Sequence, residues 1–277
     1  MEGELRHQYV KSERRGPVAV VTMDNPRTMN AMDQDLGPAL VAALEAAGAE
    51  PGVRALVLTG AGGVYSAGGN LARAHRHLQE HPQGGAGEVF AGYTKWVHRV
   101  LAAILNLPVP LISAVEGAAS GAGLGWMLLS ELVVASREVK LLTGFVGVGL
   151  VPGAGVSLSL SRLLGARRAS ELLMLNRPLP PQRALEWGLV DELVPPGRAL
   201  ARSLELAGEL ARGPRRALAS TRALLARAAW QGLLPQAEAE RRVVMAAADL
   251  PAFRRRVGRF MQGKSSPRPR VGSGKEG

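Results

Sequence analysis

The chain has 277 residues, of which 47% are hydrophobic and 21% charged, a composition typical of a globular protein rather than of a disordered chain. No apolar run approaches the roughly 20 residues that cross a bilayer, and the acidic start Met1–Glu4 lacks the apolar region of a signal peptide, so we expect no membrane association. Cysteine is absent, which excludes disulfides and cysteine-ligated metals and favours a reducing, cytoplasmic location.

The formal net charge of +11 is concentrated towards the C-terminal end. Residues 254–277 contain eight Lys or Arg and one Glu, and the rest of the chain has an ordinary balance for a globular domain. We therefore expect residues 264–277 to form a basic flexible tail. Such a tail can attract polyanions, but no aromatic residue interleaves with its charges as a platform for base stacking. We do not expect nucleic-acid binding, and RNA recognition by this basic end is the weakest alternative.

Apolar runs and turn residues alternate through the first two thirds of the chain. Short apolar runs predict buried strands at 18–23, 55–60, 111–115, 132–135 and 140–143. Helical spacing and capping signals predict helices at 33–47, where Asp33 is the cap, and at 88–105, 121–129 and 156–164. A polar stretch after the second strand, with His75, His77 and His81, is expected to be an exposed loop. Beyond about Pro196 the pattern is helical, with a break at Gly213-Pro214.

This alternation predicts an α/β core in which adjacent strands come from successive strand–helix units. We divide the chain into a core of residues 1–196, a helical region of residues 197–263 and the tail of residues 264–277. The repeated strand–turn–helix rhythm fits a spiral of such units, and it fits an ordinary doubly wound sheet equally well.

Two glycine-rich turns, Tyr65–Leu71 and Gly117–Gly123, stand where predicted strands meet helices. When a thioester carbonyl becomes an enolate, negative charge develops on its oxygen, and rigid backbone N–H donors stabilise that charge by about 3 kcal/mol each. Glycine and alanine let backbone approach a ligand closely, and a helix start adds its positive dipole end. Each turn alone is also explained as an ordinary tight turn, and their assignment to a two-part oxyanion hole depends on the resemblance described next.

Six segments, in order, resemble the crotonase (enoyl-CoA hydratase/isomerase) family. They are 25–32, 65–71, 108–117, 117–123, 149–155 and 184–190, with signatures such as Tyr-Ser-Ala-Gly-Gly-Asn-Leu and Gly-Leu-Val-Pro-Gly-Ala-Gly. The resemblance covers roughly residues 8–263 and implies an α/β fold with a crotonase-like ββα spiral core and a C-terminal helical trimerisation region. Around residues 143–145 it is closest to the phenylacetate-pathway isomerase-like branch.

The resemblance also implies a site. The oxyanion-hole donors fall on the N–H groups of Ala67 and Ala122. The implied substrate-binding residues are Ser66, Ala67, Gly68, Asn70, Leu71, Ala122 and Phe145. Asn70 replaces the family's usual Asp, and ligand contact and an ordinary turn role remain equally open for it. The implied ligand is an acyl-CoA thioester, with no cofactor beyond this coenzyme A and no metal, and the implied assembly is a homotrimer or a dimer of trimers.

The catalytic carboxylates of the family are missing. Hydratases use two glutamates as acid and base, and these positions hold Gly125 and Phe145. The aspartate of the isomerase and dehalogenase branches falls on Gly153. Because none of these side chains can transfer a proton, hydration by the usual pair is not expected.

Other polar or aromatic residues are weaker candidates for the chemistry. Structural roles are favoured for Glu116 and Glu131 over catalysis, and solvent exposure is favoured for the three histidines, whose spacing is also compatible with weak metal binding. Tyr93 and Trp96 can face either a pocket or the core.

Two functions therefore remain open. The first is an acyl-CoA enzyme of the enoyl-CoA hydratase/isomerase type that stabilises an enolate, with its proton transferred by a non-standard residue, water or the substrate. The second is a catalytically degenerate acyl-CoA-binding protein that acts as a partner or regulator.

Overall fold

The computed structural model describes residues 5–263, so the predicted tail at 264–277 lies outside the described residues. Within that range a seven-stranded sheet has the order β1-β2-β3-β4-β5-β7-β9. Its strands are β1 (Leu5–His7), β2 (Val10–Arg15), β3 (Val18–Met23), β4 (Ala55–Gly60), β5 (Leu111–Val115), β7 (Leu132–Ser136) and β9 (Glu192–Val194). The first three strands pair antiparallel, and the others continue in parallel.

The strand order follows the chain order. A doubly wound sheet reverses its order at a switch point, and this sheet has no such reversal along its described strands. The spiral alternative is therefore confirmed and the doubly wound one is wrong. Strands β3 to β5 are buried along almost their whole length, as expected for parallel strands covered on both faces.

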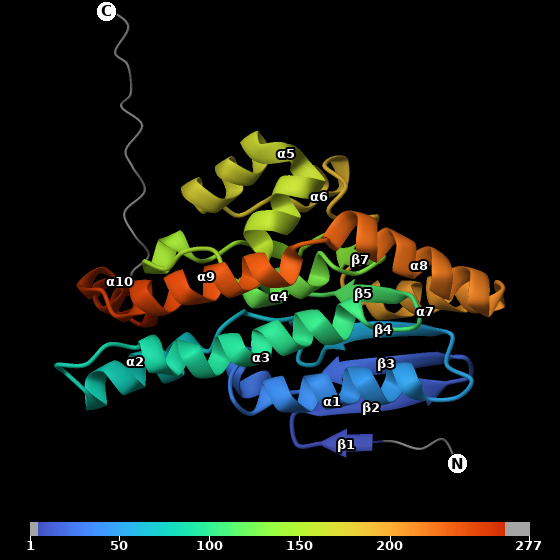
Figure 1. The fold of residues 1–277 in the computed structure, drawn as a ribbon, viewed down its shortest axis with the longest axis horizontal. Helices are drawn as coiled ribbons and strands as arrows, with labels where there is room; N and C mark the ends of the chain where they lie inside the picture. The colour runs from blue at the N-terminus through green and yellow to red at the C-terminus, as the bar shows by residue number, and fades with distance from the viewer. Residues whose placement is uncertain (1–4, 264–277) are drawn as a thin grey trace, which may run out of the picture.

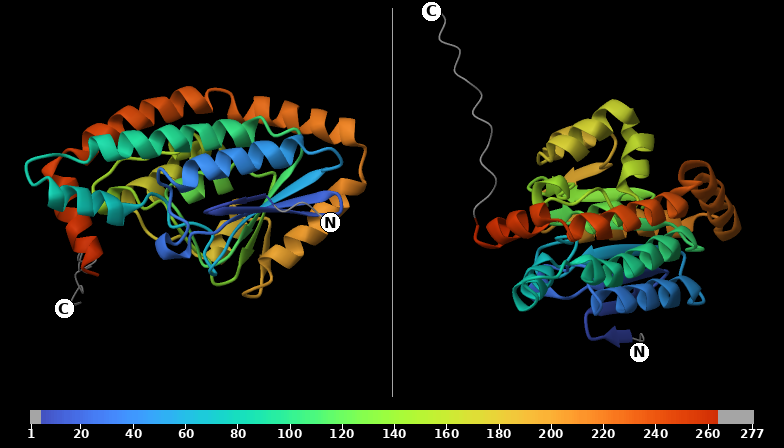
Figure 2. Two further views of the ribbon diagram at one scale, coloured as in Figure 1. Left: turned by 90° about the horizontal axis from the view of Figure 1, so that it is seen from below. Right: turned by 60° about the vertical axis from the view of Figure 1, so that its left-hand side comes forward.

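Helices cover both faces of the sheet (Figures 1 and 2). On one face α1 (Leu36–Ala49) and α3 (Gly87–Leu105) bury side chains such as Leu56 and Leu58. On the other face α7 (Ala199–Arg212) packs on Val57 and its neighbours. A two-stranded parallel sheet of β6 (Ala118–Ser120) and β8 (Lys140–Leu142) lies beside this core.

The remaining helices surround the sheet core. They are η1 (Pro26–Thr28), α2 (Leu71–Glu80), α4 (Ala122–Met127), η2 (Val146–Val148), α5 (Val156–Leu175), α6 (Pro181–Glu186), α8 (Arg215–Trp230), α9 (Leu233–Ala248) and α10 (Pro251–Met261). Helix α9 packs along α3, and α10 packs on α2. Between residues 5 and 263, none of the helices has the length and apolar surface needed to span a bilayer.

Most predicted elements are confirmed, but one expectation was wrong and two elements were not predicted. The stretch with the histidines is helix α2, not a loop, because Asn70 caps its first turn by accepting a hydrogen bond from the N–H of Arg73 at 3.1 Å. The helix expected at 156–164 is confirmed up to the non-helical Gly165, but the helical segment that follows it to Leu175 within α5 was not predicted. The hairpin β1–β2 was not predicted, because its strands alternate charged and apolar side chains only weakly.

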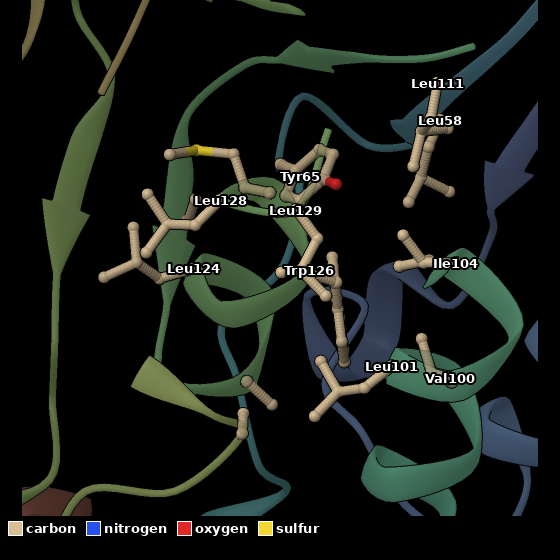
Figure 3. Close-up of a cluster of buried hydrophobic side chains, with 14 of the residues drawn as sticks. Leu58, Tyr65, Val100, Leu101, Ile104, Leu111, Leu124, Trp126, Leu128 and Leu129 are labelled. Carbon is tan, nitrogen blue, oxygen red and sulfur yellow. The ribbon is translucent and has the colours of Figure 1, made fainter. Parts of the chain in front are cut away.

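The core holds the first glycine-rich turn through Tyr65, whose ring is fully buried among leucines (Figure 3). Its hydroxyl lies 2.8 Å from the Ser113 hydroxyl, which lies 2.7 Å from that of Ser130. Burial raises the pKa of Tyr65 well above its usual range, so the phenol stays neutral. The chain of hydroxyls therefore fixes the turn without introducing a charge.

A buried arginine joins the C-terminal helices to the core. The guanidinium of Arg222, from α8, donates to the backbone carbonyls of Ile104, Leu105 and Leu107 at the C-terminal end of α3. It also pairs with Glu131 at 3.1 Å, which accepts a hydrogen bond from the Leu111 N–H as well. The structural role expected for Glu131 is confirmed.

Candidate functional site

The first glycine-rich turn runs alongside β6. The N–H of Ser66 donates to Ala118 at 2.9 Å, and the N–H of Ser120 donates back to Ser66 at 3.0 Å. The Ser66 hydroxyl donates to the carbonyl of Asn30 at 2.8 Å and accepts from the N–H of Gly68 at 3.2 Å. Ser66 is therefore fully engaged in shaping the turn, and the two predicted turns are joined by backbone hydrogen bonds.

Glycines bring the two turns into direct backbone contact. Gly68 has φ +91°, and a Cβ atom there would lie 2.7 Å from the carbonyl oxygen of Ser120. Gly121 has φ +51°, and its Cβ position lies 3.5 Å from the Cα of Gly68. No L side chain is accommodated at Gly68 without moving one turn away from the other. These glycines set the separation of the two turns.

The Ala67 N–H, predicted as an oxyanion-hole donor, is already engaged. It donates to the carbonyl of Met29 at 2.9 Å. Met29 and Asn30 both adopt left-handed backbone conformations, with φ of 54°, and this turns the Met29 carbonyl towards the glycine-rich turn. Since one amide hydrogen makes one strong bond, the expectation for Ala67 needs correction.

The N–H group of Gly69, two residues further along the same turn, is not hydrogen-bonded in this way. The N–H groups of Gly69 and of Ala122, the first residue of α4, donate to no acceptor within residues 5–263. Both residues line the same cavity. Sequence reasoning missed Gly69, because only the folded path of Met29 shows which amide of the turn is left free. The first N–H groups of a helix have no acceptor within the helix, so the Ala122 N–H remains available to a ligand.

The cavity has a volume of about 140 Å³ and is almost entirely apolar. Its lining residues are Met32, Ala67, Gly69, Leu71, Phe90, Tyr93, Thr94, Val97, Ser120, Gly121, Ala122, Leu142, Gly144, Phe145, Val148, Leu150, Gly153, Ala154, Val244 and Phe260. Hydroxyls of Tyr93, Thr94 and Ser120 are the polar side-chain groups of this lining, which includes no carboxylate, imidazole, ammonium or guanidinium group. The predicted site residues Leu71, Ala122 and Phe145 therefore share one cavity.

Two of these hydroxyls already have backbone acceptors. The Thr94 hydroxyl donates to the carbonyl of Phe90 at 2.6 Å, and the Tyr93 hydroxyl donates to that of Asn70 at 3.3 Å. Burial raises the pKa of Tyr93, so it is a neutral phenol at physiological pH. As a neutral phenol, Tyr93 can donate a hydrogen bond but is a poor base.

Two of the three positions at which the family's carboxylates were expected, Phe145 and Gly153, lie on one wall of the cavity, and the third, Gly125, packs against Ala154 of the same wall. A Cβ atom on Gly125 would lie 2.6 Å from the carbonyl oxygen of Ala154, so no side chain fits there. The Cβ position of Gly153 lies 3.6 Å from Cε1 of Phe145, in ordinary contact. An aromatic ring and bare backbone thus form this wall.

A polar groove of about 1070 Å³ lies on the other side of the first turn. Met32, Gly69 and Leu71 face the cavity, whereas Asp33, Asn70 and Ala72 line the groove. The Asn70 amide donates to the Asp33 carboxylate at 2.9 Å while its oxygen caps α2, so Asn70 has a structural role as well as exposure to the groove. Residues 69–72 therefore separate the apolar cavity from the polar groove.

The remaining candidates lie outside the cavity. Glu116 accepts a hydrogen bond from the Ala199 N–H at 3.0 Å, which confirms a structural role. Trp96 packs on the core and against Arg99, 4.9 Å from its ring. His77 and His81 stack with ring centroids 4.4 Å apart, and the described part of the chain has no cluster of three potential metal-ligating side chains.

Sequence reasoning also missed a buried carboxylate behind the wall. Glu240, on α9, accepts hydrogen bonds from the N–H of Gly155 at 2.6 Å and from the N–H of Ser157 at 3.0 Å, and another from the Ser157 hydroxyl. It therefore caps α5 from a residue far away in the sequence, which no local pattern reveals. One turn later on the same helix, Val244 lines the cavity.

We expect the stability contributed by Glu240 to depend on pH. Burial is the largest influence and raises the pKa of this carboxyl above its unfolded value. The folded protein therefore binds the proton more readily, and the contribution is complete below the unfolded pKa and decreases as pH rises through the folded pKa. Urea unfolding between pH 4 and pH 8 should show the difference between wild type and Glu240→Gln shrinking as pH rises. A difference that is constant or grows would contradict this expectation.

Comparison with known proteins agrees with this architecture. A family model described as enoyl-CoA hydratase/isomerase matches residues 13–263. A protein of Rhodobacter capsulatus described as "Probable enoyl-CoA hydratase" is 33% identical over 168 residues, which are 60% of this chain and 60% of that protein. The 1,2-epoxyphenylacetyl-CoA isomerase of Escherichia coli is 29% identical over 168 residues, 61% and 63% of the two chains. The chain thus spans about three fifths of the length of the curated relatives it matches.

Solved structures match over a longer range. The enoyl-CoA hydratase structure from Polaromonas sp. JS666 is 34% identical, with a TM-score of 0.73, and the match covers 93% of this chain and 98% of that one.

Proposed function

The chain belongs to the enoyl-CoA hydratase/isomerase (crotonase) family, and from this membership we propose that it binds an acyl-CoA thioester and polarises the carbonyl to stabilise an enolate. The observation that carries this proposal is the pair of free N–H groups, of Gly69 and Ala122, on two touching turns at the edge of an apolar cavity. Gly69 takes the place that the sequence assigned to Ala67.

The physical basis is the charge that develops on the thioester oxygen. Two fixed N–H donors in an apolar cavity stabilise that charge more strongly than water does, because they need no reorientation. Helix α4 begins at Ala122, so its positive end reinforces one of the two donors. The Ala67 N–H, held by Met29, contributes by fixing the turn rather than by contacting the ligand.

The apolar cavity and the polar groove together fit the two parts of one acyl-CoA ligand. In this proposal the acyl group occupies the apolar cavity, the thioester lies at segment 69–72, and the polar part of coenzyme A extends into the groove. Arg27 and Arg76 line that groove and form no ion pair with a carboxylate in the described residues. In the proposal their guanidinium groups bind the phosphates, beside the five carboxylates of the same lining, those of Asp24, Asp33, Asp35, Glu80 and Glu88.

Hydration of the double bond is not part of the proposal. Positioned acid–base groups contribute about 10²–10⁴-fold to such reactions, and the cavity lining offers only hydroxyls. Any enolate formed here has to exchange its proton with water, with the substrate itself or with a lining hydroxyl. The absence of a carboxylate, imidazole, ammonium or guanidinium group from this lining also favours a second candidate function, a non-catalytic acyl-CoA-binding partner or regulator.

We expect crotonyl-CoA to bind to the wild-type protein and to be hydrated about 10²–10⁴-fold more slowly than by a hydratase with both carboxylates. Calorimetry measures the binding, and loss of the enoyl absorbance measures the hydration. An Ala122→Pro variant removes one donor while keeping a residue that suits the first position of a helix, and it should bind about tenfold more weakly. Unchanged affinity in this variant would argue against the donor pair.

Exchange of the α-hydrogens of a saturated acyl-CoA in D2O separates the two candidate functions. Exchange that requires the Ala122 N–H supports enolate formation, whereas binding without exchange supports the non-catalytic protein. Gly125→Glu should not restore hydration, because its Cβ would lie 2.6 Å from Ala154.

The proposal extends to the assembly and the setting. Assembly as a homotrimer or a dimer of trimers is supported by exposed apolar side chains on α5 and α8, including Met174 at 72% exposure and Leu224 at 68%. A cytoplasmic location and the lack of a cofactor beyond coenzyme A also belong to the proposal, by analogy with the family.

A further inference from the structure

The acyl cavity is small and lined by aromatic rings. Four of its lining side chains are Phe90 and Tyr93 from α3, Phe145 before η2, and Phe260 from α10. The rings of Phe90 and Tyr93 meet edge to face, with centroids 5.6 Å apart and planes at 63°. Behind them Phe253 packs on Phe90 at 5.4 Å and 85°. A further ring entering the cavity would meet this edge-to-face network.

The cavity volume limits the group that fits. At about 140 Å³ it is close to the size of an apolar cavity of about 150 Å³ that stays dry and binds benzene. A long linear chain would leave its end outside the cavity. A group of two or three carbons would leave much of the space empty and lose contacts with the wall.

The absence of charged side chains from the cavity lining further limits which acyl groups can bind. A carboxylate or an ammonium on the acyl group would lose its water on entering, and no lining side chain carries an opposite charge to replace that hydration. Aromatic rings, in contrast, favour partners whose centroids lie about 4.5–7 Å away in edge-to-face or offset geometry.

From size, shape and charge together we infer that the acyl group of the ligand ends in a single uncharged, benzene-sized ring. This inference rests on the proposed function, because it takes the thioester to be held by Gly69 and Ala122. It adds the class of acyl group, an aryl or arylalkanoyl thioester, in place of a linear fatty acyl one.

Calorimetry with a panel of thioesters tests the inference on the wild-type protein. The panel contains phenylacetyl-CoA and benzoyl-CoA, the linear butyryl-CoA and lauroyl-CoA, the charged succinyl-CoA, and coenzyme A alone. We expect at least one of the aromatic thioesters to bind at least tenfold more tightly than every other ligand. A linear thioester that binds as tightly as both aromatic ones overturns the inference and leaves the proposed function intact. If no thioester binds more tightly than coenzyme A, the proposed function itself fails.

Two neighbouring valines of α9 provide a matched pair of variants. Val244 lines the cavity, whereas Val243 is 53% exposed. Val244→Phe should fill the space for the ring and weaken phenylacetyl-CoA at least tenfold, and more than it weakens butyryl-CoA, whereas Val243→Phe should change neither. Equal affinity of wild type and folded Val244→Phe for phenylacetyl-CoA would overturn the inference.

Overpacking can unfold a protein, so a smaller side chain gives an independent measurement. Val244→Ala enlarges the same cavity and should raise the affinity for naphthylacetyl-CoA relative to phenylacetyl-CoA at least threefold. An unchanged ratio of the two affinities would show that the ring of the acyl group does not bind in this cavity.

Discussion

Replacing Arg222 with methionine is expected to lower the free energy of unfolding by about 3–5 kcal/mol, because it breaks a buried charge pair by removing one partner. Methionine fills similar space but donates nothing. Glu131 would lose its cationic partner and keep only backbone hydrogen bonds, such as that from the Leu111 N–H, in a place where burial already raises its pKa. The carbonyls at the end of α3 would also lose their donors.

Urea unfolding of matched variants measures this effect. Arg242→Met removes an arginine that is 76% exposed and pairs with Glu238 on the surface, so it should cost less than about 1 kcal/mol. The double variant Arg222→Met with Glu131→Gln should recover part of the loss, because no unpaired carboxylate remains buried. Similar costs for the buried and the exposed arginine would show that Arg222 is not the link between α8 and the core.

Gly68→Ala is expected to weaken acyl-CoA binding about 10–100-fold, since the two hydrogen bonds to the thioester oxygen, of about 0.5–1.5 kcal/mol each, would be lost. The new methyl group would lie 2.7 Å from the Ser120 carbonyl and would force the two turns apart. The free N–H groups of Gly69 and Ala122, one on each turn, would then lie further apart than the proposed binding of one thioester oxygen requires.

Gly63→Ala is the matched control for backbone strain. Gly63 also has a positive φ, +72°, but its Cβ position has no neighbour within 4 Å. It should therefore lose about 1–2 kcal/mol of stability and retain its affinity for acyl-CoA. If both variants bind alike, the separation of the turns does not determine binding.

The elements that were correctly predicted from the sequence are each determined by residues that are neighbours along the chain. Strands β3, β4 and β5 are uninterrupted apolar runs, because parallel strands are buried on both faces. Helix α3 has its apolar residues at helical spacing, and Gly213 and Pro214 mark the break between α7 and α8 as expected. In each case neighbouring residues carry the whole signal.

The parts that the sequence did not predict depend on distant residues. Helix α2 buries Ala74 and Leu78 on a mainly polar helix that packs against α10. Glu240 reaches α5 from another helix. The choice between the amides of Ala67 and Gly69 depends on the backbone of Met29, which only the folded chain places beside the turn.

The residues that line the cavity come from almost the whole described chain, from Met32 to Phe260. A ribosome adding about 5–20 residues per second would take roughly 10–45 seconds to synthesise that span. A nascent chain can therefore form its central sheet well before it can hold any ligand. Ligand binding cannot guide these early folding steps, and a polypeptide cut before α9 would keep the sheet strands but lack Val244 and Phe260. Retention on an immobilised acyl-CoA would then distinguish full-length from prematurely terminated chains.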